Sequence, residues 1–199
     1  MRIAVATHAA RGTDSITPLT VQTAQMFAAN GIDFVIRYLG SITPQELSWI
    51  LTAGLAFMPV TFADVFDGNK AVDQLQTLGI PTGATVWLDL EGIGPSITPA
   101  TLIQRINAWA LEIKAAGYLP GLYCGANGQL TSKELYSLLV VRYWKSLSRV
   151  EDRNGQIAEP DCGYSMLQLY PTTSQNGVSV DKNIVCQDYQ GRMPTWIVA

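Results

Sequence analysis

The sequence predicts an α/β protein: one small (β/α)8-type barrel, the TIM-barrel architecture, spanning residues 1–199 as a single domain. Three observations lead to this prediction. Helical segments and short strand-like segments alternate along most of the chain. The strand-like segments are apolar on both faces, as in a parallel sheet covered by helices. They number about eight, which favours a closed barrel over an open sheet. Because 199 residues is short for this fold, we expect some helices to be short or missing.

The helix starts are marked by a repeated tetrapeptide, Ser-Ile-Thr-Pro, at residues 15–18, 41–44 and 96–99. Thr is a good N-cap, and Pro is favoured at the first helical position because the N–H that it lacks would be unpaired there. A glycine that can adopt the left-handed conformation follows each predicted helix. The predicted helices and their closing glycines are 18–30 with Gly31, 44–53 with Gly54, 69–78 with Gly79, and 99–116 with Gly117.

Two further sequence pairs have the capping-box pattern, in which the N-cap side chain and the residue three positions later bond reciprocally. They are Thr43 with Glu46, and Thr131 with Glu134. Short runs rich in β-branched and aromatic residues lie between the helices and after the last one. The first predicted strand lies within 3–14, and the others are 32–39, 55–62, 85–90, 119–124, 140–147, 164–170 and 178–186.

The composition excludes several classes of function. The net charge is −3 and no basic cluster occurs, so a phosphate-tracking nucleic-acid surface is not expected. No apolar run approaches the ~18 residues that cross a bilayer, so no membrane partner is expected. Residues 1–12 are too short and too interrupted for a Sec signal. We therefore expect a soluble chain made in the cytoplasm, with release or export to the cell wall by another route left open.

Three cysteines, Cys124, Cys162 and Cys186, are too few for a disulfide framework and contain no C-x-x-C pair. We expect buried thiols, with a Cys162–Cys186 bridge left open. The single histidine, His8, argues against Ser-His-Asp, Cys-His and histidine–metal schemes. No G-x-G-x-x-G or Walker A loop is present, so we predict no cofactor. Clustered carboxylates leave Mg²⁺ or Ca²⁺ as a lesser alternative to a site without metal.

The pair Asp89 and Glu91 is the most informative motif. They end a predicted buried strand, and residues i and i+2 of a strand point to the same face. Two carboxylates that close repel each other, and burial raises the pKa of at least one. One protonated and one ionised carboxyl is what acid/base cleavage of a glycosidic bond requires. The plainer alternative is a strand that ends in an acidic loop.

Active sites of such barrels lie at the carboxyl ends of the strands. Asp14 follows the first predicted strand and belongs to this mouth, unless it only forms an Asx turn. Asp181 reaches the mouth only if the last strand begins earlier than its pattern suggests. Other strand-end side chains are candidates for substrate binding: Arg37, Tyr38, Tyr123, Trp144, Gln168 and Tyr170. Arg37 is equally suited to a structural ion pair, and Trp144 to the barrel wall.

Several segments, in this order, resemble the family 25 glycoside hydrolases, which are lysozymes, and more closely the glycoside-hydrolase-like domains of bacteria and phages related to them. Leu88-Asp89-Leu90-Glu91 resembles the lysozymes' D-x-E. The other matching segments are Gly12-Thr13-Asp14, residues 31–40, 53–55, 78–81, 116–123, Leu167-Gln168-Leu169-Tyr170 and Val180-Asp181. Leu167 departs from the family pattern, which has Trp at that position.

The resemblance implies a (β/α) barrel that hydrolyses a cell-wall polysaccharide, with peptidoglycan the expected substrate, as in a phage or bacterial endolysin. Glu91 would be the general acid. Asp89 would stabilise the developing oxocarbenium ion or orient the acetamido group of the substrate. Asp14 and Asp181 would line the same mouth and tune both. Two alternatives remain on the same barrel: a glycan-binding protein that does not cut, and a structural or assembly component.

Overall fold

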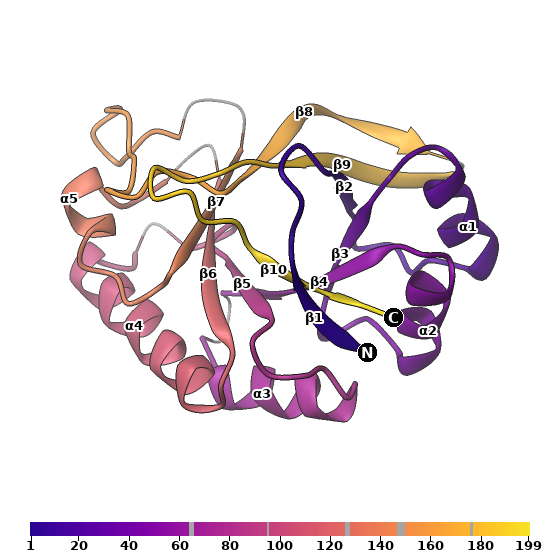
Figure 1. Cartoon of the computed structure of the whole chain (residues 1–199). Coiled ribbons are helices and arrows are strands. Elements are labelled where there is room, and N and C mark those ends of the chain that lie inside the picture. The colour runs from indigo at the N-terminus through magenta and orange to yellow at the C-terminus, as the bar shows by residue number, and fades with distance from the viewer. Residues whose placement is uncertain (64–65, 95, 126–127, 147–149, 176) are drawn as a thin grey trace.

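The structure is a computed structural model that describes residues 1–63, 66–94, 96–125, 128–146, 150–175 and 177–199. Figure 1 shows the arrangement of its elements. The helices are α1 (Val21–Ala29), α2 (Pro44–Thr52), α3 (Gly68–Thr77), α4 (Pro99–Ala115) and α5 (Ser132–Leu135). The strands are β1 (Arg2–Val5), β2 (Arg11–Asp14), β3 (Phe34–Tyr38), β4 (Ala56–Phe62), β5 (Thr85–Asp89), β6 (Leu119–Cys124), β7 (Arg142–Ser146), β8 (Met166–Gln175), β9 (Val178–Val185) and β10 (Thr195–Val198).

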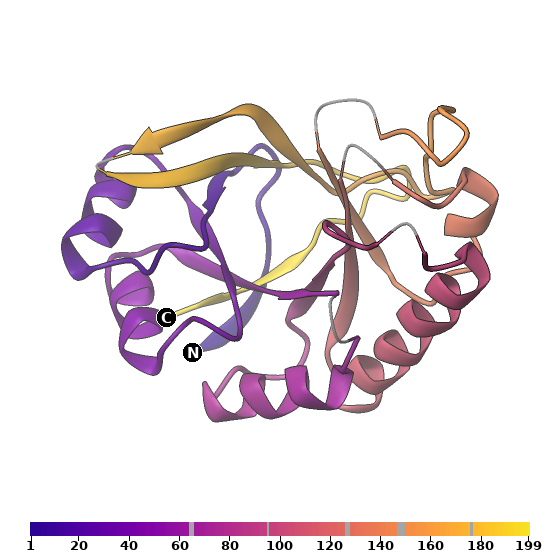
Figure 2. The ribbon, with the colours of Figure 1, turned by 180° about the vertical axis from the view of Figure 1, so that it is seen from behind.

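Strands β2 to β9 close into a barrel, which confirms the predicted fold class. From β2 to β8 each neighbouring pair is parallel. Strand β9 is antiparallel to both β8 and β2, so the prediction of a sheet parallel throughout is wrong at this strand. The reason is that β8 and β9 form a hairpin. It lies along the top in Figure 1 and also in Figure 2, which shows the molecule from behind. A two-strand hairpin reverses the chain without a crossover helix.

Strands β1 and β10 were not predicted as separate elements. They pair antiparallel with each other, and Ile197 of β10 also pairs with Phe57 of β4. Strands β4 and β5 pair only near their carboxyl ends. At their amino ends, the Thr195 amide donates to Thr85 Oγ1 (2.9 Å) and the Thr195 hydroxyl donates to the Gly83 carbonyl (2.6 Å). Strand β10 therefore fills the gap where β4 and β5 diverge, and the two chain ends lie close together in both ribbon views.

Of the four predicted Thr N-caps, three are confirmed and one, Thr17, is wrong. Thr43, Thr98 and Thr131 are N-caps, and the Thr131–Glu134 capping box forms in full. Helix α1 instead begins after Thr20, whose hydroxyl accepts from the Thr23 amide. The first Ser-Ile-Thr-Pro copy forms a turn, in which Ser15 Oγ accepts from the Thr17 amide (3.0 Å). The expected strand 140–147 is observed as β7, and residue 147 lies outside the described residues.

Two apolar clusters hold the fold together. One lies between the barrel and the helices around it. The other fills the barrel interior and includes Phe34, Met58, Trp87, Trp144 and Trp196. Gly121 of β6 is required beneath one of these rings, because a Cβ there would lie 2.4 Å from the Trp87 ring. The interior is thus a packed core, and ligands have access only at its ends.

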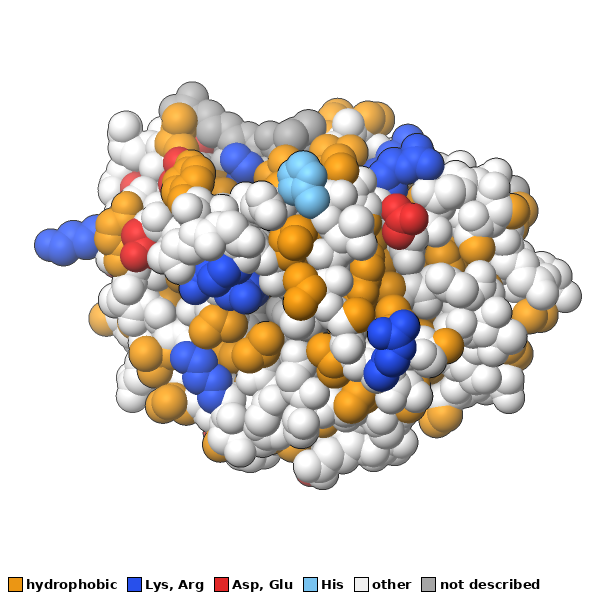
Figure 3. Space-filling model, in the orientation of Figure 1, with side chains coloured by type: hydrophobic (Ala, Val, Ile, Leu, Met, Phe, Trp, Pro, Cys, Tyr) orange, Lys and Arg blue, Asp and Glu red, His pale blue; other side chains and the backbone are white. Residues whose placement is uncertain are grey.

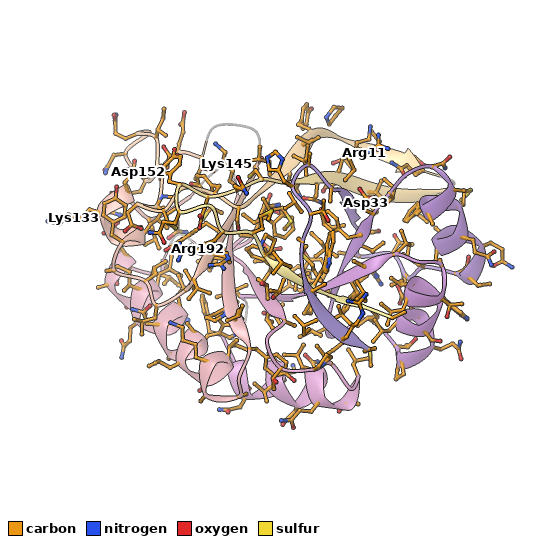
Figure 4. All side chains as sticks on the ribbon, viewed as in Figure 1. Arg11, Asp33, Lys133, Lys145, Asp152 and Arg192 are labelled. Carbon is orange, nitrogen blue, oxygen red and sulfur yellow. The ribbon has the colours of Figure 1, made fainter. Side chains whose placement is uncertain are left out.

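The surface in Figure 3 carries a central band of apolar side chains with Lys and Arg side chains on either side of it. Arg11 and Asp33 lie side by side in Figure 4, and the Arg11 amide donates to Asp33 Oδ2 (2.8 Å). All three cysteines are free thiols, so the bridge left open by the sequence does not form. Among the described residues, no helix combines the length and apolar character needed to cross a membrane.

Candidate active site

A cavity of about 430 Å³ opens at the carboxyl ends of the parallel strands. All four predicted catalytic carboxylates line it: Asp14, Asp89, Glu91 and Asp181. Asp181 lies there because β9 runs antiparallel, which brings the start of that strand to the mouth. In the β2–β9 pair, Asp181 stands directly opposite Asp14. Asp181 was expected at the mouth only if its strand began earlier than predicted. It reaches the mouth because the strand runs in the opposite direction, and not because it begins earlier.

Asp89 is buried and has both carboxylate oxygens engaged. The Tyr38 hydroxyl donates to Oδ2 (2.7 Å), and the Glu91 amide donates to Oδ1 (2.8 Å). The Asp89 carboxylate is therefore fixed in position at the last residue of β5. Such a group is suited to electrostatic stabilisation, because it does not have to reorganise when positive charge develops beside it.

Glu91 differs from Asp89 in both exposure and contacts. It lies in the loop after β5 and is exposed. Its carboxylate contacts the Tyr123 hydroxyl at 3.2 Å. A Cβ on Gly125 would come within 3.0 Å of Glu91, so the absence of a side chain at residue 125 leaves room for it. Glu91 is thus the carboxyl of the pair that a bound molecule can reach.

A polar network links the two sides of the mouth through Gln168. The Gln168 amide nitrogen lies 3.2 Å from Asp14 Oδ2 and 3.5 Å from Asp181 Oδ2. Its oxygen lies 2.5 Å from the Tyr123 hydroxyl. The opposite amide orientation would point the Gln168 oxygen at two carboxylates, so the network itself determines the orientation. Asn183 adds a second donor to Asp14 Oδ2 at 2.7 Å.

The Tyr123 hydroxyl has one hydrogen but two oxygen neighbours, Gln168 Oε1 and Glu91 Oε1. The shorter contact assigns that hydrogen to Gln168, whose oxygen can only accept. Glu91 is left with the longer contact of 3.2 Å, in which the Tyr123 hydroxyl donates only weakly. Tyr123 therefore stabilises the ionised form of Glu91 less than a full hydrogen bond would.

Burial is the largest cause that raises the pKa of three carboxyls in the mouth. Burial raises the pKa of Asp14 to about 7, although the hydrogen bonds from Asn183 and Gln168 oppose the shift. Burial also raises the pKa of Asp89, against the bonds from Glu91 and Tyr38. For Glu91, partial burial and then the charge of Asp89 raise the pKa, while the Tyr123 contact lowers it. Perturbed carboxyls gathered in one cavity are typical of acid/base sites.

The structure brings together four of the six predicted substrate contacts: Tyr38, Tyr123, Trp144 and Gln168 all line the cavity. The Trp144 indole N–H is buried and has no acceptor among the described residues.

The other two predicted contacts lie elsewhere. Arg37 is fully buried, and its Nε donates to Glu46 Oε1 at 2.7 Å, so its side chain cannot touch a substrate in this structure. Arg37 thus takes the structural alternative that the sequence left open. Tyr170 is 82% exposed on the β8–β9 hairpin and does not line the cavity.

Several residues in or beside the mouth were not predicted, among them Phe62 and Thr172, which line the cavity, and Asn183, which contacts Asp14. Asn183 follows Asp181 by two positions, so the strand period that paired Asp89 with Glu91 would have found it. Phe62 ends β4 and is half exposed, and its ring stacks on Tyr38 with centroids 4.0 Å apart. Thr172 donates to Asp181 from the hairpin, and no sequence signal marks it.

No three His, Cys, Asp or Glu side chains in the described part of the chain are grouped so that they could hold a metal ion. The four carboxyls of the mouth instead lie among hydroxyl and amide groups. The site can therefore supply a proton donor, a fixed negative charge and a ring of hydrogen-bond donors.

A family model, described as "Rv2525c-like, glycoside hydrolase-like domain", matches residues 25–185. The chain belongs to this family. The match covers β3 to β9, and therefore Asp89, Glu91, Gln168 and Asp181, but it begins after Asp14. This membership agrees with the resemblance to glycoside-hydrolase-like domains that the sequence segments carry.

Solved structures agree on the fold. An uncharacterised protein of B. stearothermophilus has a TM-score of 0.68 at 21% identity, over 88% of this chain and 95% of that one. A Streptococcus pneumoniae virulence factor, described as a glycosyl hydrolase 25, has a TM-score of 0.58 at 11% identity, over 88% and 86%. At these identities the likeness concerns the fold alone. No curated protein matches the chain.

Proposed function

We propose that this protein is a glycoside hydrolase that cuts a cell-wall glycan, with peptidoglycan as substrate, in the manner of a lysozyme. One observation carries the proposal: two adjacent carboxyls in one cavity have different environments. Asp89 is buried with both oxygens engaged, whereas Glu91 is exposed beside a hydroxyl whose shorter hydrogen bond goes to Gln168. This division matches an acid and a stabilising carboxylate. Membership of a glycoside hydrolase-like family supports the reaction class.

In the proposed reaction Glu91 donates its proton to the glycosidic oxygen as the bond from that oxygen to the anomeric carbon breaks. Positive charge develops on the sugar ring, and the fixed Asp89 carboxylate stabilises it. Asp14 and Asp181 stand across the mouth, and the charge of Asp181 helps Glu91 to keep its proton by raising its pKa. A water molecule then adds its oxygen to the anomeric carbon and returns a proton to Glu91.

The test compares wild type, Glu91→Gln and Asp73→Asn on purified cell wall, measuring the release of reducing sugar. Asp73 is an exposed carboxyl of α3 that does not line the cavity, so it is a matched carboxyl-to-amide control. A general acid contributes about 10²- to 10⁴-fold, so Glu91→Gln should lose at least about a hundredfold while Asp73→Asn keeps full activity. Equal activity in wild type and Glu91→Gln contradicts the proposal. Binding to the wall without turnover supports the glycan-binding alternative instead.

A further inference from the structure

A second cavity of about 360 Å³ adjoins the mouth and plays no part in the reaction described above. The two cavities have three residues in common, Ile16, Tyr38 and Phe62. Ile16 and Phe62 are exposed, at 68% and 48%, and Phe62 is stacked on Tyr38. The stacked rings form a low apolar wall, here called the Phe62 wall, with the acidic mouth on one side and the second cavity on the other.

The two cavities differ in chemistry. Four carboxyls line the mouth, whereas the second cavity has one ammonium group, Lys70, and one carboxylate, Asp67. The Asp67 carboxylate accepts from the Lys70 amide at 2.8 Å as the N-cap of α3. Among the described residues, the Lys70 ammonium has no ion pair or hydrogen bond. An anionic group that the mouth would repel therefore finds a cation immediately across the Phe62 wall.

A second donor belongs to the wall of this cavity. Trp109 of α4 lines it and is buried, at 1% exposure. Its indole N–H has no acceptor among the described residues. Buried donors are nearly always paired, so this N–H, in a residue that lines the cavity, is a polar group that the described contacts of the protein leave unexplained. The Gln74 side chain adds a further amide to the lining.

We propose that this cavity is a subsite for a carboxylate-bearing substituent of the glycan. The sugar ring packs on the Phe62 wall, and its carboxylate accepts hydrogen bonds from Lys70 and Trp109. The proposal deepens the proposed function and rests on it for the identity of the ligand as a glycan. The volume is in the range of small-molecule sites, and the mixture of apolar wall and few polar groups is typical of them.

This subsite would influence which sugars the protein binds. A neutral sugar gains only the contact with the Phe62 wall, whereas a sugar with a carboxylate gains two donors as well. Polymers in which every second sugar carries a carboxylate would thus be oriented along one direction across the mouth. The Phe62 wall would fix which linkage lies beside Glu91.

Binding can be measured without any turnover. The probes are N-acetylglucosamine and N-acetylmuramic acid, which differ only in a lactyl ether that carries a carboxylate. The observable is the indole N–H signal of Trp109 in protein labelled with ¹⁵N-tryptophan, one of five indole signals. Substitution Trp109→Phe assigns that signal. The acid should move it, and the neutral sugar should move it little.

Two matched lysine variants separate a specific contact from a general charge effect. Lys70→Gln should weaken binding of the acid about two- to fivefold, as expected for a solvent-exposed ion pair, and leave the neutral sugar unaffected. Lys133→Gln should change neither, because Lys133 projects away from the body of the protein on α5 (Figure 4). Phe62→Ala should weaken both sugars.

An equal response to both sugars, or an acid-specific response that survives Lys70→Gln, overturns the subsite. A chain that binds the acid as expected but releases no sugar from cell wall keeps the subsite and loses the proposed hydrolysis. A chain that releases sugar from cell wall but shows no acid-specific shift of the Trp109 signal keeps the proposed hydrolysis and loses the subsite. The two proposals thus fail in distinguishable ways.

Discussion

At the scale of single residues, the mouth depends on where a few hydrogens lie. Tyr123 has one hydroxyl hydrogen between Gln168 and Glu91, and Gln168 is oriented by Asp14 and Asp181. Burial and the neighbouring carboxylates raise the pKa of Tyr123, so it stays protonated and can donate. Gln168 acts through Tyr123 and is a positioning residue in this arrangement.

Substitutions at Gln168 and Tyr123 should shift the pKa of Glu91 in opposite directions. Gln168→Met removes the competing acceptor, so Tyr123 can donate to the Glu91 carboxylate and lower its pKa. Tyr123→Phe removes the contact that lowers this pKa, so the pKa should rise. Because a general acid must be protonated, the alkaline limb of kcat/KM against pH should move down in the first variant and up in the second. The ¹³C carboxyl shift of Glu91 gives the same pKa without activity, and parallel shifts in the two variants would contradict the hydrogen assignment.

Asp14 should make stability depend on pH. Its pKa is higher in the folded chain, about 7, than the ordinary value of 3.8. The folded state therefore binds this proton more tightly, and the stabilisation is complete below about 3.8 and lost as pH rises through about 7. The raised pKa values of Asp89 and Glu91 act with the same sign.

The measurement is urea denaturation at about pH 5 and about pH 8, in wild type and Asp14→Asn. Wild type should be less stable at the higher pH, and Asp14→Asn should show a smaller difference because it has no proton to lose. Asp73→Asn, on the surface, should behave as wild type. A wild-type stability that rises from pH 5 to pH 8 would show that Asp14 is not the dominant group.

At the scale of elements, a buried ion pair fastens α2 to the barrel. Arg37 of β3 donates to Glu46 of α2, and its guanidinium also donates to the Ser15 carbonyl in the loop after Asp14. Glu46 in turn accepts from the Leu19 amide at 2.9 Å. From the sequence, Glu46 was assigned to a capping box with Thr43, and Arg37 was a candidate for either substrate binding or an ion pair with an unnamed carboxylate. The pairing could not be predicted, because the 3.6 and 2.0 periods describe one element at a time.

Removing one member of this pair should be more harmful than removing both. Glu46→Ala leaves Arg37 as an uncompensated buried charge and should cost about 3–5 kcal/mol of unfolding free energy. The double variant Arg37→Met with Glu46→Leu should lose less than Glu46→Ala, because no charge is left unpaired. Urea denaturation of the single and double variants gives both values. A double variant less stable than Glu46→Ala would mean that the pair contributes more than charge compensation.

At the scale of the whole molecule, the parts predicted from the sequence are those with local signals. Capping residues and apolar runs identified three of the four Thr caps, the closing glycines and the strands β3 to β7. Strand β10 was missed because four residues near the chain end have no periodicity to read. The reversal at β9 was missed because the apolar pattern of a strand does not report its direction. Both concern the closure of the barrel, which depends on pairing between distant segments.

Closure at the amino end of the barrel should depend on Ile197. This residue is fully buried and pairs with Phe57 where β4 and β5 diverge. Ile197→Ala should lower the unfolding free energy by about 2–5 kcal/mol, as for other buried Ile truncations. The neighbouring Val198→Ala, at a partly exposed position of the same strand, should cost much less. Because the second cavity adjoins the mouth, away from the amino ends of the strands where Ile197 lies, Ile197→Ala should leave the Trp109 indole signal unchanged while the chain remains folded. A loss of stability no greater than that of Val198→Ala would show that β10 is peripheral to the closure of the barrel.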